Sequence, residues 1–381
     1  MTATRIVARV RSARIGDRVA IGSLPATVVA IDGDRIVVAP EDGAERCVLG
    51  IPLLGRAVDG MGKPLDGRPP PQGRRLPHTG ATPPVELEPL RVPLWSGVRA
   101  IDGLLTLVRG MRIGIFGPPG SGKSCLLDAI ARGIEADAVV ISLVGERANE
   151  AQARIAACDS RTTIVCAPSD RSAGEKLATG DLALAHARAL RDYGLHVAVV
   201  FDSLARYADA ARQAGLARGE LPARGGYPPG VWPRLAALCE QAGATAFGSI
   251  TLIATVLSDA VDAADPVAEA ARSYLDGHIV LSRRRADRGA FPAIDVPASL
   301  SRPMPAAVDE RHKDAAARIR AALARLDDSR EARELGLRSA EAEVTRAVAG
   351  EAALEAFLRQ GPEAVPASET LGDLTRLADT V

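Results

Sequence analysis

The sequence predicts a mixed α/β chain with a small β-rich unit at its N-terminus, a central domain around a mostly parallel sheet, and a helical C-terminal domain. Three observations predict this order. Short apolar runs separated by close turns fill residues 1–75. Continuous Val, Ile and Leu runs alternate with helical stretches over residues 95–304, as in strands that are buried on both faces. Residues 305–381 are rich in Ala, Arg, Glu and Leu at helical spacing.

Composition excludes several classes of protein. The chain has 381 residues, enough for two or three domains at roughly 100 to 200 residues each. Its 47 Lys and Arg balance 47 Asp and Glu, which argues against a dedicated nucleic-acid binder. No apolar run reaches the roughly 18 residues of a membrane span, and the first residues carry arginines where a signal peptide is apolar. Five scattered cysteines favour a reducing compartment, so we expect a cytoplasmic protein.

The N-terminal unit, residues 1–75, reads as a small barrel or sandwich of short strands. The expected strands cover residues 6–15, 26–31, 35–39 and 46–51. No aromatic residue precedes Trp95, so this unit lacks the rings on which single-stranded nucleic acid stacks. Eight prolines between residues 67 and 93 predict an extended linker, assigned to residues 76–94.

In the central domain, residues 95–304, five apolar runs are the expected strands. They cover residues 112–116, 138–144, 162–166, 197–201 and 249–257. In the C-terminal domain, Ile319, Leu323 and Leu326 recur at helical spacing, and a further helix is expected over residues 352–358.

A complete phosphate-loop pattern, G-x-x-x-x-G-K-[ST], follows the first of these strands. Its residues are Gly117, Pro118, Pro119, Gly120, Ser121, Gly122, Lys123 and Ser124. The loop opens a predicted helix that can end at Gly133, so its backbone N–H groups would converge on phosphate at a helix N-terminus. Lys123 would neutralise the β and γ phosphates, and the Ser124 hydroxyl would bind Mg²⁺. The prolines remove N–H donors only at 118 and 119.

Two further carboxylates end apolar runs. Asp202 follows residues 197–201 and could hold the metal, although an Asp in this position also serves as a turn or helix cap. Glu146 and Arg147 follow residues 138–144. Glu146 could orient an attacking water, or the two could form a surface ion pair of little energetic consequence.

Ordered segments along most of the chain resemble one family. They are residues 54–67, 96–103, 117–124, 145–147, 201–207, 226–231, 265–266, 275–283, 291–295 and 299–302. In order and spacing they are similar to the ATPases of bacterial type III secretion and flagellar export, relatives of the catalytic β subunit of rotary ATP synthases. The Gly-Tyr-Pro-Pro run at 226–229 favours the export ATPases over the rotary subunits. One departure is Asn149, where the family pattern Gly-Glu-Arg-Gly-Arg-Glu has arginine.

The resemblance implies a small N-terminal β-barrel, a RecA-like P-loop NTPase domain and a helical C-terminal domain. It implies catalytic roles for Lys123, Glu146, Arg147, Arg206 and Arg302, with Glu146 polarising the water and Arg302 reaching into a neighbouring subunit's site. Residues 117–125, which include Cys125, would bind ATP, and Phe291 would pack on adenine where relatives more usually have Tyr. The residues implied to hold Mg²⁺ or its waters are Ser124, Glu150 and Asp202.

The implied function is an ATP hydrolase that energises type III protein export by releasing chaperones from substrates and unfolding them. It would act as a homohexameric ring at the cytosolic face of the inner membrane. The implied partners are stator and central stalk proteins and chaperone–substrate complexes, with no nucleic acid. Alternatives are a nucleotide-binding ring component that does not hydrolyse ATP, a rotary ATP synthase-like subunit, and a ring-shaped RNA translocase. The motifs do not separate an injectisome from a flagellar system.

Overall fold

The computed structural model describes residues 6–9, 18–21, 24–32, 35–40, 46–73, 75–77, 83–257, 265–337 and 341–381. The strands are β1 (Ile6–Arg9), β2 (Arg18–Ile21), β3 (Leu24–Asp32), β4 (Arg35–Pro40), β5 (Arg46–Val48), β6 (Ala57–Val58), β7 (Arg75–Pro77), β8 (Pro93–Leu94), β9 (Leu107–Val108), β10 (Arg112–Gly117), β11 (Ala138–Glu146), β12 (Thr162–Pro168), β13 (His196–Asp202), β14 (Gly243–Ala244), β15 (Ser249–Leu257), β16 (Gly277–Leu281) and β17 (Ile294–Ser301). The helices are α1 (Arg99–Leu104), α2 (Lys123–Gly133), α3 (Ala148–Ala156), α4 (Ala173–Asp192), α5 (Leu204–Ala217), α6 (Val231–Cys239), α7 (Pro266–Tyr274), α8 (Arg283–Asp287), α9 (Met304–Ala307), α10 (Glu310–Asp328), α11 (Arg330–Glu334), α12 (Ala342–Ala349), α13 (Glu351–Leu358) and α14 (Ala367–Ala378), with short 3-10 turns at Ile51–Leu53, Pro84–Glu86 and Arg224–Gly226.

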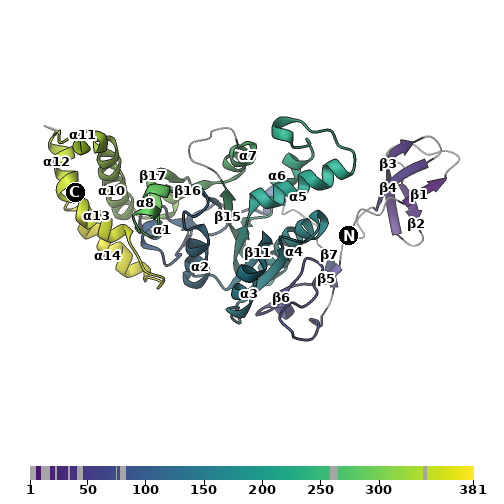
Figure 1. Ribbon diagram of the computed structural model, residues 1–381. Helices are drawn as coiled ribbons and strands as arrows, with labels where there is room; N and C mark the ends of the chain where they lie inside the picture. Colours follow the sequence, from purple (N-terminus) through teal and green to yellow (C-terminus); the bar gives the residue numbers. More distant parts are fainter. Residues whose placement is uncertain are drawn as a thin grey trace.

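A large sheet forms the centre of the molecule (Figure 1). Its strand order is β17-β16-β10-β15-β13-β11-β12-β6, with β14 paired to β15. The seven strands from β16 to β6 are parallel, whereas β17 and β14 run antiparallel to their neighbours. The five apolar runs of the central domain form β10, β11, β12, β13 and β15. The predicted mixed α/β class with a mostly parallel sheet is therefore confirmed.

Helices cover both faces of this sheet, which explains why its strands are apolar throughout. Along β15, Leu252 packs with α4 to α7 on one face, and its neighbour Ile253 packs on the other. That second face is covered by α1, α2 and α3 and by the C-terminal helices. Both side chains are fully buried, and burial of each contributes about 1.5–3 kcal/mol.

The C-terminal helices share one core with the sheet. Ile319, Leu323 and Leu326, the residues predicted at helical spacing, are buried on α10, and the predicted helix over 352–358 corresponds to α13. In Figure 1, α10 lies beside β17, and the yellow helices α13 and α14 pack next to α10. Among the described residues, no helix combines the length and apolar character that a membrane crossing requires.

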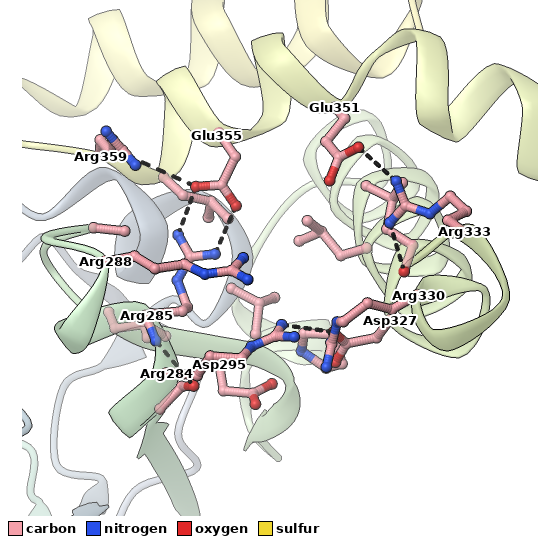
Figure 2. A pocket seen from close by; sticks show the side chains of 18 of the residues that line it. Arg284, Arg285, Arg288, Asp295, Asp327, Arg330, Arg333, Glu351, Glu355 and Arg359 are labelled. Carbon is pink, nitrogen blue, oxygen red and sulfur yellow. Dashed lines mark hydrogen bonds and ion pairs between the residues drawn. The ribbon is translucent and has the colours of Figure 1, made fainter. Parts of the chain in front are cut away.

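A charged cavity of about 430 Å³ lies where the C-terminal helices meet α8 and β17 (Figure 2). Six arginines and five carboxylates line it, so its charge is nearly balanced. Arg285 pairs with Glu355 at 2.7 Å across this junction, and Arg284 reaches Asp327 at 3.6 Å. No residue of the phosphate loop is part of the lining. The cavity is therefore an ionic junction between the C-terminal helices and the sheet rather than the predicted nucleotide site.

Strands β1 to β4 form an antiparallel sheet in the order β1-β4-β3-β2. The expected strand over residues 6–15 is described only as β1, and its remainder lies outside the described residues. β2 was not predicted. The expected strand over residues 46–51 ends early, at Val48, because a 3-10 turn that contains Pro52 follows it. Closure of these strands into a barrel remains a prediction.

The short strand β6 joins the large sheet by parallel pairing with β12. Leu53 and Val58 are fully buried against the core that includes α4. This pairing differs from the prediction, which placed the whole of residues 1–75 in one N-terminal unit. A two-residue strand is too short to show any periodicity, so the sequence pattern carried no signal of it.

An ion pair beside β6 holds this edge of the sheet. Arg56 Nε donates to Asp66 Oδ2 at 2.7 Å, and the two side chains are 11% and 9% exposed. The backbone N–H groups of Arg68 and Ala57 also donate to this carboxylate. The Arg56 hydrogen bond, with these backbone donors, outweighs the effect of burial and holds the pKa of Asp66 well below its usual value.

We expect Asp66→Asn to lower the free energy of unfolding by about 2–3 kcal/mol at pH 7, because it breaks a buried charged pair. A carboxyl group whose pKa is lowered in the folded protein stabilises the fold at pH values above its unfolded-state pKa of about 4. This stabilisation is lost as the pH falls below that value. The difference between wild type and Asp66→Asn should therefore shrink below about pH 4 in urea unfolding.

Asp170→Asn, at an exposed carboxylate, is the control and should change stability little at either pH. A difference between wild type and Asp66→Asn that stays constant from pH 7 to pH 3 would contradict this account.

Candidate active site

The phosphate loop joins the end of β10 to the start of α2, as the sequence predicts. Gly120 and Gly122 have φ angles of 77° and 88°, a region that favours glycine. α2 begins at Lys123, so the backbone N–H groups of its first turn have no partner within the helix. The loop thus presents N–H donors and the positive end of a helix dipole, the two features that bind phosphate.

Side chains of the loop hold its shape. Ser121 is buried, and both its backbone N–H and its hydroxyl donate to the Pro118 carbonyl, at 3.3 and 2.8 Å. Lys123 Nζ donates to the carbonyls of Gly117 and Pro118, at 2.6 and 2.7 Å. The lysine therefore lies over the loop, where it can meet phosphate. Ser124 and Cys125, the next two residues of α2, are exposed.

Phe291 lies against the loop from a distant part of the chain. A Cβ atom on Gly122 would stand 3.1 Å from Cε1 of the Phe291 ring, which is tighter than most Cβ contacts, so glycine lets the ring pack close to the loop. The Phe291 carbonyl accepts a hydrogen bond from the Gln360 backbone N–H, which links the segment that carries the ring to the C-terminal helices. The ring is 43% exposed and leaves a free aromatic surface beside the loop. This placement suits stacking on a nucleotide base.

Glu146 ends β11 and is buried. Its Oε2 accepts from Arg206 Nη1 at 2.6 Å, and its Oε1 accepts from the Arg147 backbone N–H at 3.1 Å. Burial alone would raise the pKa of Glu146, but these hydrogen bonds outweigh burial and lower it. Arg147 itself is exposed and pairs with Glu150 at 3.4 Å. The lowered pKa favours the ionised carboxylate, the form that can act as a base toward a water molecule.

Asp202 ends β13 and is also buried. Thr255 Oγ1 donates to its Oδ1 at 2.8 Å, and Arg154 Nη1 donates to its Oδ2 at 3.3 Å. No group of three or more His, Cys, Asp or Glu side chains gathers as a metal cage in the described parts of the chain. One hydroxyl and one or two carboxylates nevertheless suit Mg²⁺, which keeps several waters and takes its other ligands from phosphates.

The carboxyl edge of the parallel sheet brings most of these groups together. Gly117, Asp202 and Glu146 are the last residues of β10, β13 and β11. Neighbouring strands lie about 4.8 Å apart, so the three positions fall within about 15 Å of one another along one edge. A triphosphate with a bound metal ion can span such an edge. Phe291, just before β17, lies at the same edge.

Arg302 is the exception among the predicted site residues. It follows β17, whose first residue Ile294 pairs with Leu281 near the loop and whose last residue Ser301 pairs with Gly277 at the far end of β16. The Arg302 backbone N–H donates to the Asp276 carbonyl at that far end. β10 alone spans about 16 Å between the two edges, so Arg302 does not reach the phosphate loop of its own chain.

Sequence reasoning missed two residues that contact Asp202. Thr255 was detectable in principle, because it is a polar residue near the carboxyl end of an apolar run. Arg154 was not detectable, since nothing in its helical surroundings distinguishes it from a solvated charge.

Known proteins are similar to this chain in sequence. The ATP synthase alpha/beta family, nucleotide-binding domain, matches residues 97–301, more than half of the chain. The flagellum-specific ATP synthase of Pseudomonas aeruginosa is 40% identical over 343 residues, which cover 86% of this chain and 75% of that protein. The type 3 secretion system ATPase of Sinorhizobium fredii is 42% identical over 339 residues, with the same shares. The chain belongs to this family of export ATPases.

Solved structures agree with membership of the export ATPases. The assembled ATPase EscN from the type III secretion system of enteropathogenic E. coli has a TM-score of 0.87 and 35% identity, over 99% of this chain and 98% of that one. EscN in complex with its central stalk EscO gives a TM-score of 0.85 at the same identity and coverage. The resemblance read from the sequence motifs is therefore confirmed.

We expect Phe291→Leu to weaken ATP binding about tenfold, because a branched aliphatic side chain fills space but cannot stack on adenine. Phe291→Tyr keeps the ring and should bind ATP within about twofold of wild type. Equilibrium titration with a fluorescent ATP analogue measures both. Equal affinities for wild type and Phe291→Leu would show that the base binds elsewhere.

Proposed function

We propose that this export ATPase hydrolyses ATP with Mg²⁺ and uses the energy for type III protein export. Family membership supports the activity, and the placement of Lys123, Glu146 and Asp202 at one sheet edge supports the chemistry. The strongest support for the proposal is the separation of Arg302 from the phosphate loop of its own chain. A chain with every part of the site except one requires a neighbour to supply that part.

Each residue would then have a defined task. The loop N–H groups and Lys123 would hold the phosphates, and Phe291 would hold the base. Ser124 and Asp202, with Glu150 at the start of α3, would hold Mg²⁺ or its waters, and the metal would neutralise charge on the phosphates. Glu146, kept ionised by its hydrogen-bonding partners, would orient the attacking water.

The ring geometry follows from Arg302. A head-to-tail interface that closes would bring the exposed Arg302 of one subunit to the loop of the next. Arginine fingers of this kind contribute about 10³ to 10⁵ in rate, or about 4–7 kcal/mol of transition-state stabilisation. Arg147 and Arg206, beside Glu146, would act within the subunit. We propose a homohexamer on this basis, in line with the assembled EscN structure.

The cellular setting is part of the same proposal. A central stalk protein would contact the ring, as EscO contacts EscN. We further propose stator proteins and chaperone–substrate complexes as partners, release and unfolding of export substrates as the work done, and the cytosolic face of the inner membrane as the place.

We expect the specific ATPase activity of wild type to rise with protein concentration, because only assembled subunits have complete sites. Arg302→Ala should lose about 10³-fold in turnover at every concentration while it still binds ATP. The assay is phosphate release with Mg²⁺-ATP across a dilution series.

Arg376→Ala is the matched control for this assay. Arg376 lies on α14, is exposed and pairs with Asp373 on its own helix, so activity should stay within about twofold of wild type. Specific activity that stays flat on dilution into monomers, or an Arg302→Ala variant as active as the control, would refute a shared site.

A further inference from the structure

Arg154 lies behind the proposed magnesium site and ties together three elements. It sits on α3, where its Nη1 is 3.3 Å from Asp202 Oδ2 and its Nε is 3.0 Å from Asp128 Oδ1. Asp202 ends β13, and Asp128 lies on α2, the helix that follows the phosphate loop. The Arg154 side chain is only 12% exposed, so the guanidinium is held mainly by these two carboxylates.

Asp128, the second carboxylate that Arg154 contacts, connects Arg154 to the helix that follows the phosphate loop. Asp128 follows Ser124 by four residues on α2, and residues four apart share one face of a helix. Through Asp128, Arg154 therefore contacts the same face of α2 that carries the Ser124 hydroxyl. Its other contact is Asp202, the carboxylate proposed to share the metal with Ser124. One guanidinium thus fixes the spacing between the two sides of the metal site.

The orientation of Asp202 depends on the same contact. Thr255 donates to one carboxylate oxygen, and Arg154 donates to the other. Two donors from different elements fix both the position and the plane of a carboxylate. Groups of this kind, which orient a ligand without touching the metal, commonly affect metal sites strongly when they are removed. The planar, many-donor guanidinium suits this bridging role better than an ammonium group does.

We propose that Arg154 is a positioning residue for ATP hydrolysis, which holds Asp202 and the phosphate-loop helix in register for the metal. It touches neither ATP nor Mg²⁺ and acts through Asp202. The inference rests on the proposed metal site and adds a residue to it. With Asp128 and Asp202, Arg154 forms a triad of formal charge −1, so the site keeps its attraction for a divalent cation.

We expect Arg154→Met, which keeps the side-chain length but donates no hydrogen bond, to lower kcat about tenfold. The KM for Mg²⁺-ATP should stay within about twofold, because the loop and Phe291 still bind the nucleotide. Arg154→Lys should recover most of the loss, since it keeps the charge but contacts one carboxylate at a time.

A matched control separates positioning from general stability. Arg56→Met breaks the Arg56–Asp66 pair, which is as buried as the Arg154 pair but lies beside β6. Its kcat should stay within about twofold of wild type even when its unfolding midpoint falls as much as that of Arg154→Met. Equal losses of kcat in both variants would reduce Arg154 to a stabilising contact and overturn the proposal.

A double-mutant cycle with Asp202→Asn gives the sharpest test. If Arg154 acts through Asp202, adding Arg154→Met to Asp202→Asn should lower the residual kcat by less than about twofold. A further tenfold loss, or a kcat of Arg154→Met equal to that of wild type, would overturn the positioning role. If Arg154→Met does not fold, Asp128→Asn takes its place in the cycle, because it removes the other carboxylate that Arg154 contacts. The expected loss of kcat for Asp128→Asn is about threefold.

The cycle also separates a failure of the proposed metal site from a failure of the positioning role. If Asp202→Asn itself hydrolyses ATP like wild type, the proposed metal site is wrong and the role of Arg154 falls with it. If Asp202→Asn is impaired but Arg154→Met is not, the metal site stands and only the positioning role is rejected.

Discussion

The common direction of the central strands is the constraint on which the site depends. Parallel strands end at one edge, so the residues that follow or close β10, β11 and β13 meet there although they are far apart in sequence. Helices on both faces make these strands apolar up to their last residues, where polar side chains become possible. The phosphate loop, Glu146 and Asp202 are the polar ends of three buried strands.

The antiparallel strand β17 has the opposite effect. It starts beside the phosphate loop, just after Phe291, and returns along β16 to the other edge, where Arg302 follows it. One strand therefore places Phe291, the aromatic residue proposed to bind the base, within the subunit's own site, and it places Arg302 out of reach of that site. The proposed ring of subunits follows from the antiparallel course of β17 along β16, because only a neighbouring chain can bring Arg302 to a phosphate loop.

The sequence predicted those parts of the structure that leave a local pattern. Five apolar runs became strands, the phosphate loop joined strand to helix, and Glu146 and Asp202 ended their strands as expected. Parts set by contacts between distant residues were not predicted. β6 is too short for periodicity, and the Arg154 contacts join α3 to residues 26 and 48 positions away. The separation of Arg302 from the loop became visible only through the register of β17.

Complementation between two inactive variants tests the shared site most directly. Lys123→Ala removes the loop amine and Arg302→Ala the arginine, so each pure ring has no complete site. When the two variants are mixed 1:1 before assembly, about one interface in four would pair an intact Lys123 with a neighbour's intact Arg302. We predict that the mixture releases phosphate well above the sum of the separate variants. Activity equal to that sum, in rings shown to contain both variants, would contradict a site divided between subunits.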